Sequence, residues 1–269
     1  MKLAALQMTS GIDVASNLAT AASLLAEAAA GGACLALLPE NFSFMGRREA
    51  DKRSVSEAFG SGPVQDFLAE QARKLGIMVI GGTLPLRVPG ETRSAQACLA
   101  FAADGSLAGR YDKIHLFDVD LPGREESYRE SSGMVPGREV VVIETPAGKA
   151  GLSICYDMRF PELYRQLSAR GAQLLMVPAA FTVPTGRAHW DVLLRARAVE
   201  NLCTVVAAGQ WGTHENGRET WGHSQIIDCW GEIHATLPEG TGCVLADFDP
   251  AHQADVRTRF PALSHRVLV

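Results

Sequence analysis

The sequence predicts an α/β protein in which mixed β-sheets are covered by helices. Short apolar runs typical of buried strands alternate with longer segments that have helical spacing. Both halves of the chain show strand, helix, strand, helix and then paired strands, so parallel and antiparallel pairing are both expected. The 269 residues, 47% of them hydrophobic, can bury a large core, and no linker or change in composition divides them. We therefore expect one domain over residues 1–269, with two halves that a pseudo-twofold axis could relate.

In the first half, helices are expected where apolar residues recur every three or four positions. Asn17–Ala30 is rich in Ala and Leu and ends at Gly31, and residues 62–75 have similar spacing and end at Gly76. Strands are expected at residues 2–8, 34–38, 77–83 and 95–101, and a further short strand leads into Tyr111. Residues 118–137 are polar and lack periodicity, which predicts a long loop, either over a site or flexible.

The second half repeats this pattern. A helix is expected over Pro161–Ala169, because proline suits a first helical position where its missing N–H has no partner. A second helix is expected from about residue 188 to residue 201, after a loop. Strands are expected at residues 140–143, 151–155, 174–177 (ended by Pro178), 204–208, 224–228, 232–237 and 244–248.

Charge and cysteine content exclude several classes of protein. The formal net charge of −5 argues against a nucleic-acid or anionic-membrane partner. The N-terminal apolar run is too short for a signal peptide, and no apolar run has the length of a membrane span. The six cysteines form no CxxC pair and have no histidine at metal spacing. We therefore expect reduced thiols in a cytoplasmic protein, with no metal and no cofactor.

Cys155 is the first candidate for chemistry. It stands where an apolar strand ends and the chain turns sharply into the helix at Pro161. A side chain at such a turn can face a cleft, and the backbone N–H groups that follow it, beginning with Tyr156, can bind a developing anion. Most free cysteines are small core residues, so the pattern alone leaves that alternative open.

Glu40 and Lys113 share this placement near strand ends, where open α/β sheets bind ligands. A carboxylate, an ammonium and a thiol together would suit attack on a carbonyl carbon. Glu40 could take the thiol proton and later activate water. Lys113 could favour the thiolate and, with the Tyr156 N–H, stabilise negative charge on the substrate oxygen. For Glu40 and Lys113 taken separately, a charge pair at the edge of the core is the alternative.

Three segments resemble the signature blocks of the nitrilase superfamily of carbon–nitrogen hydrolases, in the family's order: Leu37–Asn41, Tyr111–Leu116 and Ile154–Glu162. The resemblance covers essentially the whole chain. It implies that Glu40 is the general base, Lys113 the cation that stabilises the oxyanion, and Cys155 the nucleophile. The family's second glutamate would be Glu130, although Glu125 and Glu126 lie near it.

The resemblance also implies a fold and an assembly. The fold is a four-layer α-β-β-α sandwich with mixed sheets. In this family it is commonly doubled into α-β-β-α-α-β-β-α across a dimer, so a homodimer or a higher homo-oligomer is expected.

Segments 178–182, 185–190 and 194–201 resemble the small amidases of the superfamily, most closely the deaminated glutathione amidase branch. This implies hydrolysis of the terminal amide of a small anionic α-keto acid-type substrate to carboxylate and ammonia, through a cysteine thioester. The ω-amidase branch, which acts on α-ketoglutaramate and succinamate, is the next resemblance. Nitrilase and N-carbamoyl amidohydrolase activities are further alternatives. Arg187 replaces the proline of the family pattern, which could alter the lip of the pocket.

An anionic substrate needs cationic groups, and a guanidinium matches a carboxylate with two hydrogen bonds. Arg47, Arg159 and Arg187 are the candidates for this contact, and Phe181 and Thr185 lie in the segments that resemble the amidases.

Two different readings remain at this level. One is a protease-like Cys–His dyad that uses His115, His189 or His223 as the base. The other is a scaffold without activity that serves as an interaction partner.

Overall fold

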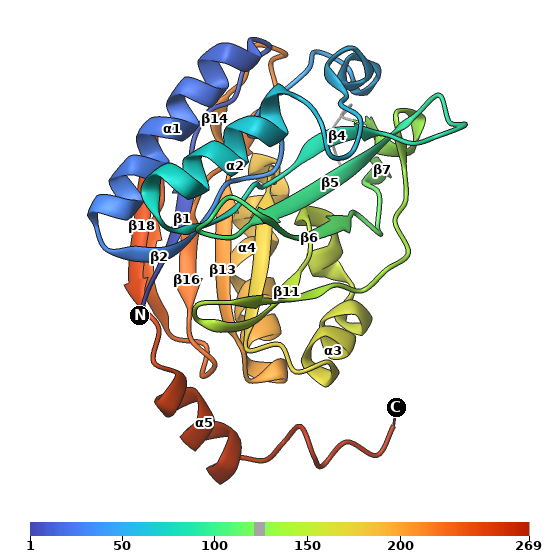
Figure 1. Ribbon diagram of the computed structural model, residues 1–269. Coiled ribbons are helices and arrows are strands. Elements are labelled where there is room, and N and C mark those ends of the chain that lie inside the picture. Colours follow the sequence, from blue (N-terminus) through green and yellow to red (C-terminus); the bar gives the residue numbers. More distant parts are fainter. Residues whose placement is uncertain (121–126, 269) are drawn as a thin grey trace.

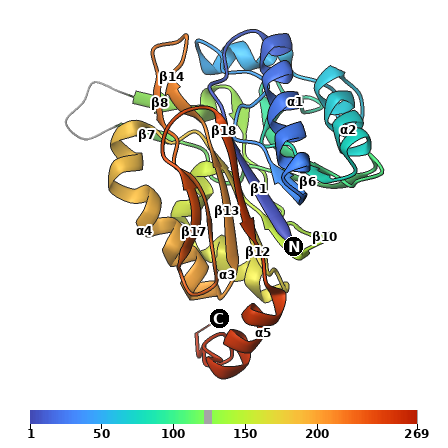
Figure 2. The same ribbon diagram turned by 90° about the vertical axis from the view of Figure 1, so that its left-hand side faces the viewer.

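Two β-sheets packed face to face form the centre of the molecule, and helices cover both outer faces (Figure 1). This computed structural model describes residues 1–120 and 127–268. Seen at right angles, α1 and α2 cover one sheet and α4 covers the other (Figure 2). The four layers α-β-β-α confirm the expected fold class. No helix in the described ranges is both long and apolar enough to cross a membrane.

The first sheet has eight strands in the order β18-β1-β2-β3-β5-β4, with β6 and β9 also paired to β5. Its strands are Lys2–Gln7 (β1), Ala33–Leu37 (β2), Met78–Ile80 (β3), Leu84–Arg87 (β4), Ser94–Phe101 (β5), Leu107–Asp112 (β6), Met134–Val135 (β9) and Gly242–Asp247 (β18). The three strands β1, β2 and β3 are parallel, and antiparallel β18 and β5 flank them.

The second sheet has six strands in the order β10-β11-β12-β13-β16-β17. They are Val142–Thr145 (β10), Gly148–Leu152 (β11), Leu174–Ala179 (β12), Thr204–Gly209 (β13), Ser224–Ile227 (β16) and Ile233–Leu237 (β17). Again three parallel strands, β11, β12 and β13, lie between antiparallel neighbours. Each sheet thus has the mixed pairing that the sequence predicts.

The alternation of side chains along a strand explains the layering. In β1, Leu3 and Ala5 belong to the core between the two sheets, whereas Ala4 and Leu6 belong to the core under α1 and α2. Successive side chains of a strand point to opposite faces, so a strand covered on both faces is apolar throughout. This is why the continuous apolar runs mark the buried strands of this protein.

Five α-helices are described: Val14–Ala30 (α1), Pro63–Leu75 (α2), Pro161–Ala169 (α3), Val183–Asn201 (α4) and Pro250–Arg259 (α5). Their ends follow local chemistry. The Asp13 side chain accepts a hydrogen bond from the Ala15 N–H at the start of α1, and Gly76 takes a left-handed conformation at the end of α2. Short 3₁₀ helices occupy Glu49–Val55 (η1), Glu130–Ser132 (η2) and Cys155–Arg159 (η3).

Several predicted strands begin or end at other residues in the structure. The strand expected over residues 77–83 stops at Ile80, because the chain turns at Gly82 into β4, which the sequence did not reveal. Gly82 has φ of +46°, and a Cβ there would lie 2.0 Å from the Pro39 carbonyl oxygen, so only glycine fits. The strand expected to end at Pro178 continues to Ala179. Strand β11 has ended before this point, so Pro178 has a strand partner on one side only, in β13, and a proline without an N–H is tolerated there.

Two further expectations were wrong, and some elements were not predicted. Helix α4 begins at Val183, five residues before the expected start. The predicted loop 118–137 contains a hairpin of Asp118–Asp120 (β7) with Ser127–Arg129 (β8), followed by η2 and β9; its residues 121–126 lie outside the described ranges. The sequence also did not reveal α5 or the hairpin of Trp211–Thr213 (β14) with Glu219–Trp221 (β15).

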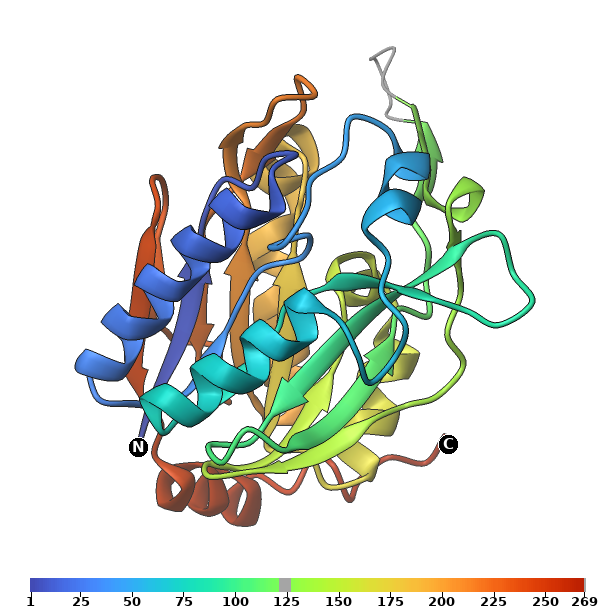
Figure 3. The same cartoon turned by 45° about the horizontal axis from the view of Figure 1, so that its top comes forward.

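The segments that follow β2, β6, β11 and β12 all reach one end of the sandwich. With that end brought forward, η1, the β7–β8 hairpin and the β14–β15 hairpin form a rim around it (Figure 3). The carboxyl ends of parallel strands are where open α/β sheets bind ligands. The fold therefore directs attention to this end.

Candidate active site

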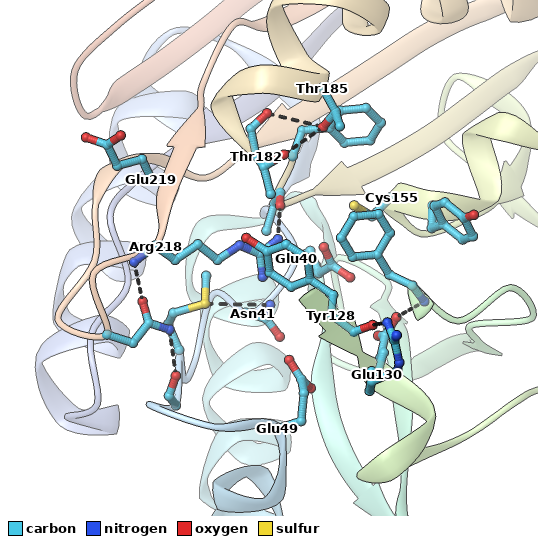
Figure 4. Close-up of a pocket in the computed structure, with 18 of the residues that line it drawn as sticks. Glu40, Asn41, Glu49, Tyr128, Glu130, Cys155, Thr182, Thr185, Arg218 and Glu219 are labelled. Carbon is cyan, nitrogen blue, oxygen red and sulfur yellow. Dashed lines mark hydrogen bonds between the residues drawn. The ribbon is translucent and has the colours of Figure 1, made fainter. Parts of the chain in front are cut away.

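Lys113, Glu40, Glu130 and Cys155 line one cavity of about 560 Å³ at this end (Figure 4). The Lys113 Nζ lies 2.8 Å from the Glu40 Oε1 and 2.9 Å from the Glu130 Oε2. All four side chains are buried, and Lys113 is only 2% exposed. A buried ammonium between two buried carboxylates, beside a thiol, is the arrangement of groups that the sequence predicted for Glu40, Lys113 and Cys155.

Backbone contacts fix the position of Glu40. It follows β2, and Asn41 after it has φ of +59°, a left-handed conformation that asparagine tolerates. The Asn41 N–H donates to Thr83 Oγ1 at 2.7 Å, and Gln96 Nε2 donates to Asn41 Oδ1 at 2.6 Å. Gln210 Nε2 donates to the Glu40 carbonyl at 3.0 Å. These buried hydrogen bonds hold the carboxylate at the cavity.

Cys155 lies on a strained turn held by Asp157. Strand β11 ends at Leu152 and does not reach Cys155 as expected; Cys155 begins η3 with φ of +48°, which costs a non-glycine residue energy. The buried Asp157 carboxylate accepts hydrogen bonds from the Tyr111 hydroxyl at 2.7 Å, the Ile154 N–H at 2.9 Å and the His115 N–H at 3.0 Å. The Asp157 carboxylate therefore links Tyr111 and His115, which lie on either side of Lys113 in the sequence, to the turn at Cys155.

Glu130 is fixed in the same way. Its carboxylate accepts hydrogen bonds from Lys113 Nζ and, at 2.7 Å, from the Phe117 N–H. Glu125 and Glu126, the neighbours that the sequence could not separate from it, lie outside the described residues. Glu130 has the contacts expected of the second glutamate.

The charges of the site support one another. Burial is the largest effect and raises the pKa of Glu40, but the charge and hydrogen bond of Lys113, together with Lys52 and the Cys155 thiol, outweigh it, so the net pKa is lowered. Burial would lower the pKa of Lys113, but Glu130 and Glu40 raise it well above its ordinary value. Glu40 is therefore ionised at neutral pH and Lys113 is protonated.

The ionisation state of Cys155 differs from the prediction, which was that Lys113 favours the thiolate. Burial and then the Glu40 carboxylate raise the pKa of Cys155, and the opposing effect of Lys113 is smaller. The resting nucleophile is a thiol beside an ionised carboxylate. Such a pair suits transfer of the thiol proton to Glu40 during attack.

Tyr156, the expected backbone donor, is the second residue of η3. The first hydrogen bond of this turn runs from the Asp157 N–H to the Ile154 carbonyl at 3.0 Å. The Tyr156 N–H precedes that bond, at a position where helical N–H groups have no partner within the helix.

The expected substrate contacts are met in part. Arg47, Arg159, Phe181 and Thr185 all line the cavity. Arg187 does not: its exposed side chain lies over the Trp221 ring at 6.0 Å. Because α4 begins at Val183, residues 185 and 187 are about 200° apart around a helix, so Thr185 faces the cavity and Arg187 faces away from it.

Several cavity residues were missed by the sequence reasoning. Lys52 is only 4% exposed, and its Nζ lies 2.8 Å from the Glu49 Oε2. The spacing of three between Glu49 and Lys52 was the available signal. Arg218 enters from the β14–β15 hairpin, which no local pattern in the sequence predicted.

The histidine alternative has no support in this geometry. No histidine of the described chain lines the cavity. His115 Nδ1 lies 2.7 Å from Asp157, His189 Nδ1 lies 3.2 Å from Arg159, and the His223 ring is stacked on Trp221. Glu40, and no described histidine, is the group beside the thiol that could accept its proton.

One group among the described residues could hold a metal ion: Asp228, Glu232 and His234 have ligand atoms within 4.8 Å of one another. It lies on the β16–β17 turn, where Asp228 already accepts the N–H groups of Trp230 and Glu232. These contacts account for the cluster without an ion.

Comparison with known proteins places this geometry in a family. The family model described as "Carbon-nitrogen hydrolase" matches residues 2–258. A deaminated glutathione amidase from Synechocystis sp. (strain PCC 6803 / GT-S) is 44% identical over 269 residues, which cover 99% of this chain and 98% of that protein.

Solved structures agree with this similarity. The crystal structure of the C. elegans NitFhit protein has a TM-score of 0.92 and 38% identity; it matches 99% of this chain, which spans only 65% of the NitFhit chain. An amidase from Nesterenkonia sp. AN1, crystallised with acrylamide added at the active site cysteine, has a TM-score of 0.80 and 28% identity over 97% of this chain and 98% of that one.

Proposed function

The chain belongs to the carbon–nitrogen hydrolase family, and from that premise we propose that it is an amidase that cleaves deaminated glutathione through a thioester on Cys155. The observation that carries the proposal is the buried Lys113 ammonium, 2.8 Å from Glu40 and 2.9 Å from Glu130, in one cavity with the thiol. The similarity to deaminated glutathione amidases supports the choice of substrate.

The first half of the reaction forms the acyl-enzyme. As the Cys155 sulfur attacks the amide carbon, the Glu40 carboxylate takes the thiol proton. The tetrahedral oxyanion lies between the Lys113 ammonium and the Tyr156 N–H, which stabilise the charge that develops there. Glu40 then gives its proton to the leaving nitrogen, the carbon–nitrogen bond breaks and a thioester remains.

The second half returns the enzyme to its starting state. Glu40, again a carboxylate, takes a proton from water as the water oxygen attacks the thioester carbon. The carbon–sulfur bond breaks, the sulfur recovers a proton from Glu40, and the carboxylic acid leaves. Glu130 acts through Lys113 and holds the ammonium in place. Burial lowers the pKa of Lys113, but Glu130 and Glu40 raise it above its ordinary value.

The charge of the cavity supports an anionic substrate. Among the described residues, seven basic ones (Arg47, Arg48, Lys52, Lys113, Arg129, Arg159 and Arg218) and four acidic ones (Glu40, Glu49, Glu130 and Glu219) line it, a formal balance of +3. The whole chain has a formal charge of −5, so the cavity is a positive region of an acidic protein. Such a cavity attracts anions.

The nature of the leaving group follows from the substrate. The expected release of ammonia does not hold for deaminated glutathione: both amide bonds of glutathione are secondary, so their cleavage releases an amine, whereas a primary amide such as succinamate releases ammonia. The assay should therefore detect both products. The expected result is the largest kcat/KM on deaminated glutathione, with smaller values on α-ketoglutaramate, a simple nitrile and an N-carbamoyl amino acid.

Two results would contradict the proposal in different ways. Turnover of the nitrile alone would refute the substrate class and spare the catalytic residues. Full activity of a Cys155→Ala variant would refute the nucleophile.

We also propose that the protein acts as a homodimer in the cytoplasm. On the outer layer formed by α4, Val192 is 62% and Val199 is 47% exposed, and Trp230 beside them is 58% exposed. An apolar face of this kind favours association with a second copy. The six free cysteines suit a reducing compartment. Light scattering should give twice the chain mass, and Val192→Glu with Val199→Glu should reduce it to the monomer; an unchanged mass would exclude this face.

A further inference from the structure

Arg218 lies in the turn between β14 and β15, and its side chain runs into the cavity toward Glu40 and Tyr128 (Figure 4). Its guanidinium carbon is 5.2 Å from the centre of the Tyr128 ring, and its Nη2 donates to the Ala180 carbonyl. Ala180 precedes Phe181, and both residues line the same cavity as Cys155. Arg218 therefore places a positive charge beside a chain segment that shares the cavity with the nucleophile.

The hairpin that carries Arg218 is fixed to the rest of the protein. Four contacts hold it: the Trp211 N–H to the Met8 carbonyl at 3.0 Å, the Trp221 N–H to the Phe181 carbonyl at 2.9 Å, His214 Nδ1 to the Ser10 carbonyl at 2.8 Å, and Asn216 Nδ2 to the Gly46 carbonyl at 2.8 Å. A side chain on such a support is already in place before a ligand binds, which reduces the entropy lost on binding.

The Arg218 guanidinium has an unused hydrogen-bond donor. Its Nε is buried and has no hydrogen-bond partner, and no described carboxylate forms an ion pair with it. Of the nearby acidic residues, Glu49 has its ion pair with Lys52 at 2.8 Å; burial raises the pKa of Glu49, and Lys52 and, after it, the Arg218 charge lower it. Glu219 points away from the centre of the cavity (Figure 4). Buried donors are nearly always paired, so this one calls for a partner from outside the chain.

The other arginines of the cavity differ from it. Arg129 pairs with Asp120 at 2.8 Å, Arg48 with Asp51 at 3.5 Å, and Arg159 has His189 at 3.2 Å. Arg47 is exposed. Arg218 thus combines a buried unpaired N–H with a rigid support and a place near the nucleophile.

We propose that Arg218 determines substrate specificity by binding a carboxylate of the substrate. This inference rests on the proposed amidase function and deepens it: the enzyme would select amides that carry a carboxylate over neutral amides of similar size. A carboxylate accepts hydrogen bonds from a guanidinium in a geometry that its charge strengthens.

The test compares an anionic and a neutral substrate. In Arg218→Ala, kcat/KM for deaminated glutathione should fall by about 10- to 100-fold, mainly through KM, while kcat/KM for butyramide stays within about twofold. Arg218→Lys should recover only part of the loss, because lysine keeps the charge but not the planar fork. Arg187→Ala is the matched control: it removes an arginine that packs on the same hairpin outside the cavity.

A purely structural Arg218 gives a different result. If it only ties the hairpin to Ala180, Arg218→Ala should lower the activity on both substrates equally, and this outcome would overturn the proposal.

Binding separates this inference from the proposed function. If the unmodified chain hydrolyses no amide, the proposed function fails, and titration calorimetry with succinamate still decides the role of Arg218. Succinamate should bind the Cys155→Ala chain at least tenfold more tightly than the Cys155→Ala, Arg218→Ala chain. Equal affinity, or no binding to either chain, would refute the carboxylate contact.

Discussion

Replacing Lys113 with methionine removes one charge from between two buried carboxylates and changes the side-chain volume little. In the native chain the ammonium lies 2.8 Å from Glu40 and 2.9 Å from Glu130, and all three side chains are buried. Without it, the buried carboxylates of Glu40 and Glu130 lie near each other with no ammonium between them. The variant therefore tests whether the site is held together by this ion pair.

The structure indicates how much the free energy of unfolding should fall in this variant. Removing one partner of a buried ion pair typically costs about 3–5 kcal/mol, because the other partner stays buried without compensation. Lys52 lowers the pKa of both carboxyl groups, although burial raises it more, so it compensates part of the charge. We therefore expect a loss near the lower end, about 3 kcal/mol at pH 8.

The loss should depend on pH in a defined direction. In the native chain the pKa of Glu40 is lowered, so its stabilising contribution is present above the unfolded value and is lost as the pH falls. In the variant, burial and the Glu130 charge would raise this pKa, so ionised Glu40 destabilises the fold and the penalty disappears as the pH falls. The difference in stability between the two chains should shrink from pH 8 to pH 5.

Urea unfolding followed by circular dichroism at pH 5, 6.5 and 8 would measure these differences. Lys149→Met is the control, because Lys149 forms an exposed ion pair with Glu144 at 3.5 Å and should change stability by less than about 1 kcal/mol. Adding Glu130→Gln to Lys113→Met should restore part of the stability, since only one carboxylate then remains. Native stability of Lys113→Met at pH 8, or a difference that does not shrink toward pH 5, would refute the reasoning.

The other predictions concern the nucleophile and its support. Cys155→Ala should lose more than about 10³-fold in kcat, since no thioester can form, and turnover kinetics with a mass measurement of the acyl-enzyme would show it. Glu40→Gln should also be inactive. Iodoacetamide should nevertheless alkylate its Cys155 faster at pH 8 than in the native chain, because burial and then the Glu40 charge raise the pKa of the native thiol and the variant lacks that charge. Peptide mapping would measure the alkylation rate, and a slower rate in the variant would contradict this prediction. Asp157→Asn should cost about 1–3 kcal/mol and lower kcat more than it changes KM, because an amide cannot accept all the hydrogen bonds of this carboxylate; an unchanged melting temperature and kcat would count against its positioning role. Gly82→Ala should destabilise the fold in thermal unfolding, since its Cβ would lie 2.0 Å from the Pro39 carbonyl oxygen next to Glu40, and a soluble, fully active variant would show that the loop adjusts freely.

A slow reaction of Cys155 at neutral pH would not identify a scaffold without activity. The raised pKa keeps the resting thiol protonated in an active enzyme as well. Loss of amide hydrolysis in Glu40→Gln, together with faster alkylation, distinguishes the two cases because it separates thiol reactivity from proton transfer.

Local patterns in the sequence were sufficient for the layers of the fold. The apolar run of β2 marked a strand covered on both faces, and Pro161 and Gly76 marked the start of α3 and the end of α2. Local patterns did not predict element boundaries that depend on contacts with residues distant in the sequence. The end of β3 depends on how closely Gly82 approaches Pro39, which a short window of sequence does not contain.

What the sequence by itself determined is therefore the alternation of strands and helices, the family, and three residues that carry the family's motifs: Glu40, Lys113 and Cys155. Only the tertiary structure decided that Glu130 contacts Lys113, that Arg187 lies outside the cavity and that Arg218 lies inside it. The physical reason is that strand and helix patterns depend on neighbours in the chain, whereas burial and ion pairing join distant residues. Lys113 and Glu40 are 73 positions apart, and their separation of 2.8 Å exists only in the folded chain.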